Sequence, residues 1–135
     1  MSSPLRGRIA LVTGAGRRLG KAIACARGER GMRVAVHYNG SADGASDTVA
    51  QIERTGGVAR AFQGDLAMGD GPSRLVDEVA DAFGGLHVLV NSAAIMLRTP
   101  VGEVTVAQWD AMFTLNLRAP FFAAQAAARR MAEGG

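Results

Sequence analysis

The chain has 135 residues, of which 48% are hydrophobic, 20% charged and 5% aromatic. This length allows one domain with a real core and is short for a two-domain enzyme. The formal net charge is +3, and all but one of the 15 basic residues are arginines. Because the arginines are spread along the chain and aromatic residues do not alternate with them, the sequence favours a solvated basic surface over nucleic-acid binding.

One cysteine and the absence of long apolar runs bear on the compartment. Cys25 stands alone, which excludes an intrachain disulfide and fits a reducing environment. The first apolar run, residues 9–12, is too short for a signal-peptide core, and no run approaches the roughly 18 residues that span a bilayer. We therefore expect a cytoplasmic protein without a membrane partner.

Apolar strands and helical segments alternate along the chain. Strands are predicted over residues 8–13, 33–38, 58–63 and 86–90, and helices over residues 19–31, 41–55, 73–83 and 105 to about 131. The strands are interpreted as apolar throughout, which implies burial on both faces, and the helices between them imply right-handed crossovers. The pattern predicts one doubly wound α/β domain with a parallel sheet.

A glycine-rich turn occupies the first strand–helix junction, where residues 13–20 read Thr-Gly-Ala-Gly-Arg-Arg-Leu-Gly. Glycines after a buried strand let the backbone approach a diphosphate, and the helix that follows presents free N–H groups and a positive dipole end. The alternative is a tight connection with no ligand. The position at the first junction of a parallel sheet favours the cofactor interpretation.

Three motifs together resemble the short-chain dehydrogenase/reductase family. They are Thr13-Gly14 with Gly20 in the glycine turn, Asp65 after the third strand, and Asn91-Ser92-Ala93 after the fourth, and the similarity extends from about Leu5 to Arg130. The resemblance implies a Rossmann fold with strand order 3-2-1-4 and a nicotinamide cofactor. Arg18 stands where the family usually has a glycine, and an arginine at this position resembles pteridine reductases. Ala94 replaces a second glycine of the usual family pattern.

The predicted cofactor-binding residues follow from the turn, from the strand ends and from the resemblance. They are Gly14, Gly16, Arg17, Arg18, Leu19, Gly20, His37, Tyr38, Asn39, Asp65, Leu66, Asn91, Ser92 and Ala93. The resemblance places Asp65 against the adenine, with Leu66 beside it. A helix-capping or turn role for Asp65 stays open, and no metal site is predicted.

The end of the second strand predicts NADP(H) in preference to NAD(H). A carboxylate there would bond the ribose 2′-OH and repel a 2′-phosphate, but the sequence has no acid between His37 and Asp43. Arg17 can reach the same region, and a guanidinium suits a phosphate. The alternative is that Arg17 and His37 are solvated surface groups.

The last predicted helix carries a polar residue in an apolar stripe. Trp109, Phe113, Asn116 and Pro120 recur at helical spacing. Pro120 has no N–H for the Asn116 carbonyl, so a kink is expected there. The resemblance implies that Asn116 supports a water-mediated proton path to the catalytic lysine; the alternative is an asparagine satisfied between helices. Met96, Met112 and Phe113 are interpreted as packing residues.

The family's catalytic serine and Tyr-x-x-x-Lys pair have no counterpart in these residues. The only tyrosine is Tyr38, four positions before Ala42, and the only lysine is Lys21. We therefore expect the chain to be the cofactor-binding half of the enzyme, truncated before the catalytic segment and inactive alone. With four strands only, the fourth strand would be an open, apolar sheet edge, which favours association. The chain then pairs with a partner, is marginally stable or is part of a longer chain. For the full-length protein we expect a homo-oligomer.

The predicted function is NADP(H)-dependent hydride transfer to or from a small-molecule carbonyl or pterin-type C=N group. The alternative is a non-catalytic module that binds NADP(H) and regulates another protein.

Overall fold

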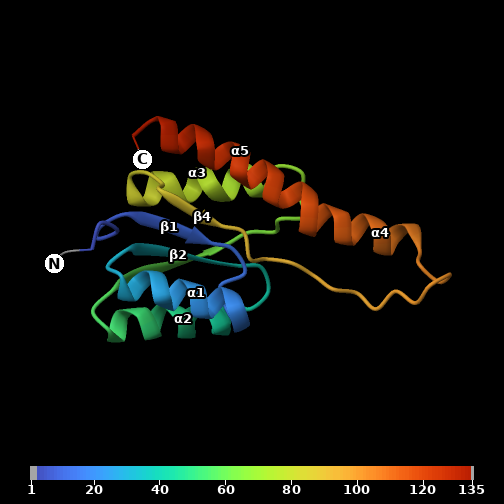
Figure 1. Cartoon of the computed structure of the whole chain (residues 1–135), viewed down its shortest axis with the longest axis horizontal. Helices are drawn as coiled ribbons and strands as arrows, with labels where there is room; N and C mark the ends of the chain where they lie inside the picture. Colours follow the sequence, from blue (N-terminus) through green and yellow to red (C-terminus); the bar gives the residue numbers. More distant parts are fainter. Residues whose placement is uncertain (1–2, 135) are drawn as a thin grey trace.

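The structure is a computed structural model that describes residues 3–134. Strands and helices alternate as far as the last strand, and three helical segments follow it (Figure 1). The elements are β1 (Ile9–Val12), α1 (Arg18–Glu29), β2 (Arg33–Tyr38), α2 (Ala42–Arg54), β3 (Val58–Gln63), α3 (Gly71–Phe83), β4 (Val88–Val90), α4 (Val106–Phe113), the π-helical segment η1 (Thr114–Arg118) and α5 (Ala119–Ala132).

The strands form one parallel sheet in the order β3-β2-β1-β4. In register, Leu11 of β1 lies between Ala35 of β2 and Leu89 of β4. The predicted α/β class and strand order are therefore confirmed. Because all strands run in the same direction, the turns after β1, β2 and β3 and the segment after β4 meet at one edge of the sheet.

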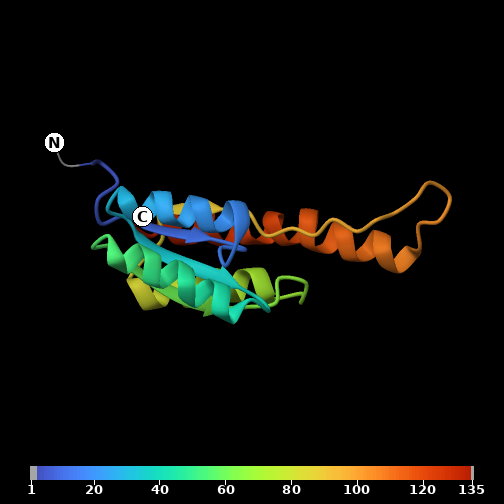
Figure 2. The same cartoon turned by 90° about the horizontal axis from the view of Figure 1, so that it is seen from below.

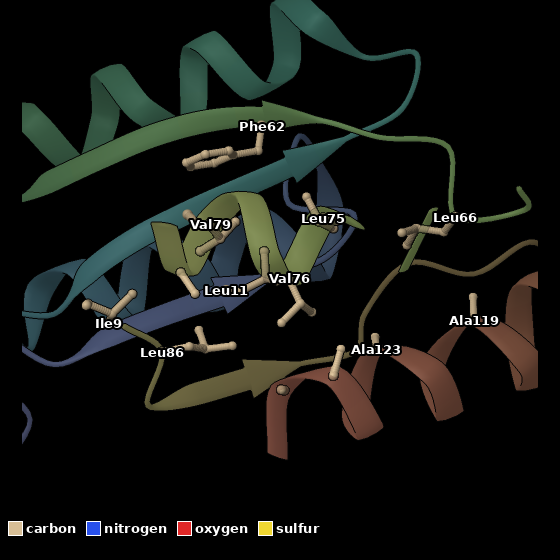
Figure 3. Close-up of a cluster of buried hydrophobic side chains, with 14 residues drawn as sticks. Ile9, Leu11, Phe62, Leu66, Leu75, Val76, Val79, Leu86, Ala119 and Ala123 are labelled. Carbon is tan, nitrogen blue, oxygen red and sulfur yellow. The ribbon is translucent and has the colours of Figure 1, made fainter. Parts of the chain in front are cut away.

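Helices cover both faces of the sheet. Figure 1 shows α1 and α2 on one side and α3 and α5 on the other. One buried cluster, which includes Leu11, Val76 and Val79, fills the space between the sheet and α3 and α5 (Figure 3). A second cluster, which includes Val34 and Ile52, lies against α1 and α2. The sheet is thus the middle layer between two apolar cores.

The two edge strands differ from the prediction that every strand is buried on both faces. β1 is buried along its whole length, but β3 is mostly exposed, with Val58 and Arg60 facing solvent and Phe62 buried. β4 is only three residues long, and all three are half-buried. The prediction was wrong for these strands because an edge strand has a neighbour on one side only.

The inward face of α1 is made of small residues. The sequence places Leu19, Ile23 and Ala26 on one face, but the buried residues of α1 are Gly20, Ala24 and Gly28. A Cβ at Gly28 would lie 2.7 Å from Cγ2 of Ile52 on α2. The glycines therefore let α1 approach its neighbours closely, and Leu19 remains 68% exposed.

The predicted last helix is interrupted. A capping box between Thr105 and Gln108 starts α4, and η1 separates it from α5. The expected disturbance near Asn116 therefore takes the form of a π-helical turn, where the Ala119 N–H bonds the Thr114 carbonyl. The packing interpretation was wrong for Met96 and Phe113, which are 92% and 45% exposed, because α4 and the segment before it project away from the sheet (Figure 2).

Within residues 3–134, no helix combines the length and the apolar character needed to cross a membrane.

Candidate functional site

Gly14 in the turn after β1 and Gly20 near the start of α1 have no room for a side chain. Gly14 has a φ of +60°, and a Cβ there would lie 2.9 Å from Cα of Ala93. A Cβ at Gly20 would lie 2.0 Å from the carbonyl oxygen of Gly14. Since these neighbours are backbone atoms, no side-chain movement would relieve the clash. The turn therefore packs tightly on both α1 and the segment after β4.

The N-terminus of α1 opens from this turn without a capping side chain. Arg17 at the N-cap makes no side-chain capping bond, and the first turn of the helix holds no acidic residue. Arg18 takes a φ of +53°, a left-handed conformation that costs a residue with a Cβ about 1–2 kcal/mol. This geometry explains the glycine that the family usually has here, and an uncapped helix start suits an anionic group.

A cavity of about 870 Å³ lies at the carboxyl edge of the sheet. All the predicted cofactor-binding residues line it except Asn91, which is exposed and lies outside the lining. Further lining residues come from the turn before α2, from the segments after β3 and β4, and from α4 and η1. Sequence reasoning missed them: Gly40, Ser41, Ala67, Ala94, Ile95, Asp110, Ala111, Thr114 and Leu115.

Thr13 links the end of β1 to the segment after β4. Its Oγ1 accepts the N–H groups of Ser92 at 2.9 Å and Ala93 at 3.0 Å, and it lies 3.4 Å from the Val90 carbonyl oxygen, to which it donates. Thr13 is buried, and the sequence did not identify it as a site residue. The available signal was a hydroxyl at the end of an apolar strand, which needs partners once buried.

His37 lies in the interior, which excludes the alternative that its side chain is a solvated surface group. The residue is 2% exposed. Nδ1 accepts the Gly14 N–H at 3.0 Å, and Nε2 lies 2.8 Å from the Gly64 carbonyl oxygen. Burial lowers the pKa of the ring, although the bond to Gly64 acts in the opposite direction.

Asp65 both lines the cavity and stabilises a turn. Its Oδ1 accepts the N–H of Ala67 at 2.9 Å, which is an Asx-type turn after β3. Its carboxylate is exposed, whereas Leu66 beside it is buried. The turn role that the sequence left open is therefore present together with a place in the cavity wall.

Asn116 bonds a lining residue rather than lining the cavity itself. Its Oδ1 accepts the Ile95 N–H at 2.9 Å, and its Nδ2 donates to the Ile95 carbonyl at 2.8 Å. Ile95 belongs to the cavity wall. The side chain of Asn116 thus holds the segment after β4 against η1, and its amide is satisfied by backbone groups.

Charges in the cavity wall are distributed unevenly. Arg17 and Arg18 lie beside the glycine turn, and Asp65 and Asp110 come from the end of β3 and from α4. All four side chains are exposed. The end of β2 contributes Tyr38 and its uncharged successors, so no carboxylate stands on that side of the cavity. Residues 3–134 contain no cluster of three or more His, Cys, Asp or Glu side chains that could hold a metal ion.

The chain belongs to the short chain dehydrogenase family, whose model matches residues 8–135. The short chain dehydrogenase/reductase AacuN of Aspergillus aculeatus is 41% identical over 97% of this chain and 50% of its own length. Versicolorin reductase stcU of Emericella nidulans is 40% identical over 97% of this chain and 50% of its own. This chain therefore spans about half the length of the curated relatives it matches.

A solved structure from Burkholderia cenocepacia, a short chain dehydrogenase in complex with NADP, is also similar. It is 44% identical with a TM-score of 0.90, and the match covers 93% of this chain and 51% of that one. The glycine turn after β1 and the uncapped start of α1 suit a diphosphate.

Proposed function

We propose that this chain is the NADP(H)-binding portion of an oxidoreductase that transfers hydride to or from a small-molecule carbonyl or a pterin-type C=N group. The observation that carries the proposal is the cavity at the carboxyl edge of the sheet, where the tight glycine turn and the uncapped start of α1 form one wall. Bound NADPH would supply the hydride. The names of the two relatives, each containing "reductase", support this reaction type.

The residues of this chain bind and orient rather than donate a proton. The turn at Gly14 and the N-terminus of α1 receive the diphosphate, and Asp65 with Leu66 borders the adenine. Asn116 holds Ile95 in the opposite wall and is proposed to support a proton path. We place the proton donor itself outside these residues, because Tyr38 and Lys21 do not form a Tyr-x-x-x-Lys pair.

We further propose a preference for NADP(H) over NAD(H). The support is electrostatic: Arg17 and Arg18 line the cavity, and the end of β2 carries no carboxylate that would repel a 2′-phosphate. Titration with NADPH and with NADH should give about tenfold tighter binding of NADPH, which corresponds to about 1.4 kcal/mol. Equal or tighter NADH binding would contradict the preference.

Substitutions of Arg17 and Arg18 test whether these two side chains cause the preference for NADP(H). Arg17→Ala and Arg18→Gly should each reduce the ratio of the NADH to the NADPH dissociation constant. Arg18→Gly also relieves the left-handed φ of +53°, so its fold should be as stable as the wild type or about 1 kcal/mol more stable. Arg129→Ala removes an exposed arginine near the end of α5 and is the control; it should leave the ratio unchanged.

A non-catalytic module that binds NADP(H) and regulates another protein is the second candidate. Turnover of carbonyl and pterin substrates by the native protein, measured as NADPH oxidation, distinguishes the two. Turnover supports the oxidoreductase, whereas tight NADPH binding by a native protein without Tyr-x-x-x-Lys or turnover supports the module.

A further inference from the structure

His37 is a buried polar residue at the point where three strand ends meet. It is the fifth residue of β2, and its ring bonds Gly14 after β1 and Gly64 after β3. Its carbonyl oxygen also accepts the N–H of Ala15 at 2.9 Å. His37 therefore receives two successive amides of the glycine turn, one on its ring and one on its backbone.

The two ring contacts define one form of the imidazole. A backbone N–H can only donate, so Nδ1 must offer a lone pair to Gly14; a carbonyl can only accept, so Nε2 must carry the proton toward Gly64. This is the neutral Nε2–H tautomer, with both nitrogens satisfied. A protonated ring would set an N–H against the N–H of Gly14.

Gly14, which His37 holds in place, contacts two parts of the cavity wall. The residue touches the Ala93 backbone across the turn, where a Cβ at Gly14 would lie 2.9 Å from Cα. It also touches Gly20 of α1 through its carbonyl oxygen. The orientation of the Gly14 peptide therefore determines how the turn meets both α1 and the segment after β4, and these are the surfaces that face the cavity.

We propose that His37 is a positioning residue for the nucleotide site, whose neutral ring holds the Gly14 peptide, and with it the glycine turn, in the shape that receives the diphosphate of NADP(H). This inference rests on the proposed NADP(H) binding. His37 needs no contact with the cofactor for this role. The role requires a hydrogen-bond acceptor at the position of Nδ1. Without it the Gly14 N–H would have no partner, and an unpaired N–H in the interior would destabilise this conformation of the turn.

Two substitutions of His37 distinguish the roles of its two ring nitrogens. The side-chain oxygen of asparagine can occupy the place of Nδ1, so His37→Asn keeps an acceptor for Gly14 and loses the donor to Gly64. The longer His37→Gln reaches the place of Nε2, so it keeps the donor to Gly64 and loses the acceptor for Gly14. Each variant loses one hydrogen bond, so general loss of stability affects both similarly.

His87 provides a matched control. Its Nδ1 accepts the Ile9 N–H at 2.9 Å, the same kind of bond to β1 but at the opposite end of that strand. His87→Gln removes that bond and lies away from the cavity. NADPH dissociation constants of the wild type and the three variants are measured by fluorescence titration, together with their thermal midpoints without ligand.

We expect NADPH to bind His37→Gln about tenfold or more weakly than the wild type, and His37→Asn within about threefold of it. His87→Gln should bind as the wild type does. Equal affinities of the Asn and Gln variants, whether both unchanged or both weakened, would overturn the inference. A wild-type chain that folds but binds no NADPH would instead contradict the proposed function on which the inference rests.

The ring itself offers a readout that needs no variant. A long-range ¹⁵N–¹H spectrum of the wild-type chain should show His37 with an unprotonated Nδ1 and a protonated Nε2. If the His37 variants do not fold, this spectrum decides: a proton on Nδ1 would overturn the inference, because Gly14 would then have no acceptor.

Discussion

Gly20 illustrates how a single contact restricts the sequence of the turn. Its α-carbon faces the carbonyl of Gly14 so closely that a Cβ would come within 2.0 Å of the oxygen. The glycine is therefore required by packing and not by its own φ, in contrast to Gly14, whose φ is +60°. Two glycines of one motif are thus needed for different physical reasons.

We predict that Gly20→Ala destabilises the fold and weakens NADPH binding. The added methyl group displaces backbone, so the free energy of unfolding should fall by about 1–3 kcal/mol, as measured by urea denaturation. Gly69→Ala is the control, because a Cβ there meets nothing within 4 Å; it should stay within about 0.5 kcal/mol of the wild type. Similar values for the two variants would contradict the packing argument.

The buried ring of His37 also predicts a pH dependence of stability. Burial lowers its pKa in the folded chain, so below about pH 6.5 the unfolded chain binds a proton that the folded chain does not. The charged side chains that line the same cavity, Arg17, Arg18, Asp65 and Asp110, are exposed and screened by solvent.

The free energy of unfolding should therefore fall as the pH drops from 7.5 to 5.5. Urea denaturation at both pH values checks this in the wild type and in His37→Asn, which has no group titrating at that position. His87, whose pKa is also lowered by burial and by Arg8, is present in both chains and cancels in the comparison. An equal fall in the two chains would contradict the assignment to His37.

At the scale of elements, the π-helical segment η1 joins two helices with different surroundings. α5 packs its alanines against α3, with Ala123 and Ala127 buried (Figure 3 shows Ala123), whereas α4 has no buried residue. η1 places Asn116 beside Ile95 and Arg118 beside the Ala67 carbonyl. The π-helical segment η1 is thus hydrogen-bonded to two parts of the cavity wall, at Ile95 and at Ala67.

We predict that Asn116→Ala loosens the segment of residues 91–105 without unfolding the sheet. Two hydrogen bonds to the Ile95 backbone are lost, so the local opening free energy should fall by about 1–2 kcal/mol. Hydrogen exchange followed by mass spectrometry should show faster exchange in that segment alone. Gln125→Ala, an exposed position on α5, is the control, and uniform acceleration over the whole chain would contradict a local role.

At the scale of the whole molecule, exposed apolar side chains lie along α4, η1 and the start of α5. β4 has no further strand beside it within residues 3–134. Trp109, Leu117 and Phe121 are 58%, 61% and 62% exposed, and with Phe113 they follow one another at intervals of four residues. A large contiguous apolar patch is costly to leave in water.

We predict that the isolated chain self-associates through this patch. Sedimentation at tens of micromolar should give a mass above the 14.0 kDa of the single chain. The double variant Leu117→Gln/Phe121→Gln should weaken the association about tenfold or more, because it removes apolar area from the contact. A chain that stays monomeric at these concentrations would contradict the prediction.

The fold was predicted from local sequence patterns. Apolar runs of strand length, helical spacing between them and a glycine-rich first turn are each contained within a few residues, and their alternation implied the parallel sheet that the structure shows. The predicted cofactor-binding residues came from the glycine turn, the end of the second strand and the family resemblance.

What the sequence by itself determined was therefore the fold class, the strand order implied by the family resemblance, and the glycine turn and strand ends that form part of the cavity wall. Only the tertiary structure decided that Phe113 and Leu19 are exposed, that edge strand β3 is partly uncovered, and that His37 is buried with both ring nitrogens bonded. The partners of His37 lie 23 and 27 positions away along the chain. Burial and hydrogen bonding of that kind depend on which distant segments the fold brings together, and no local pattern encodes them.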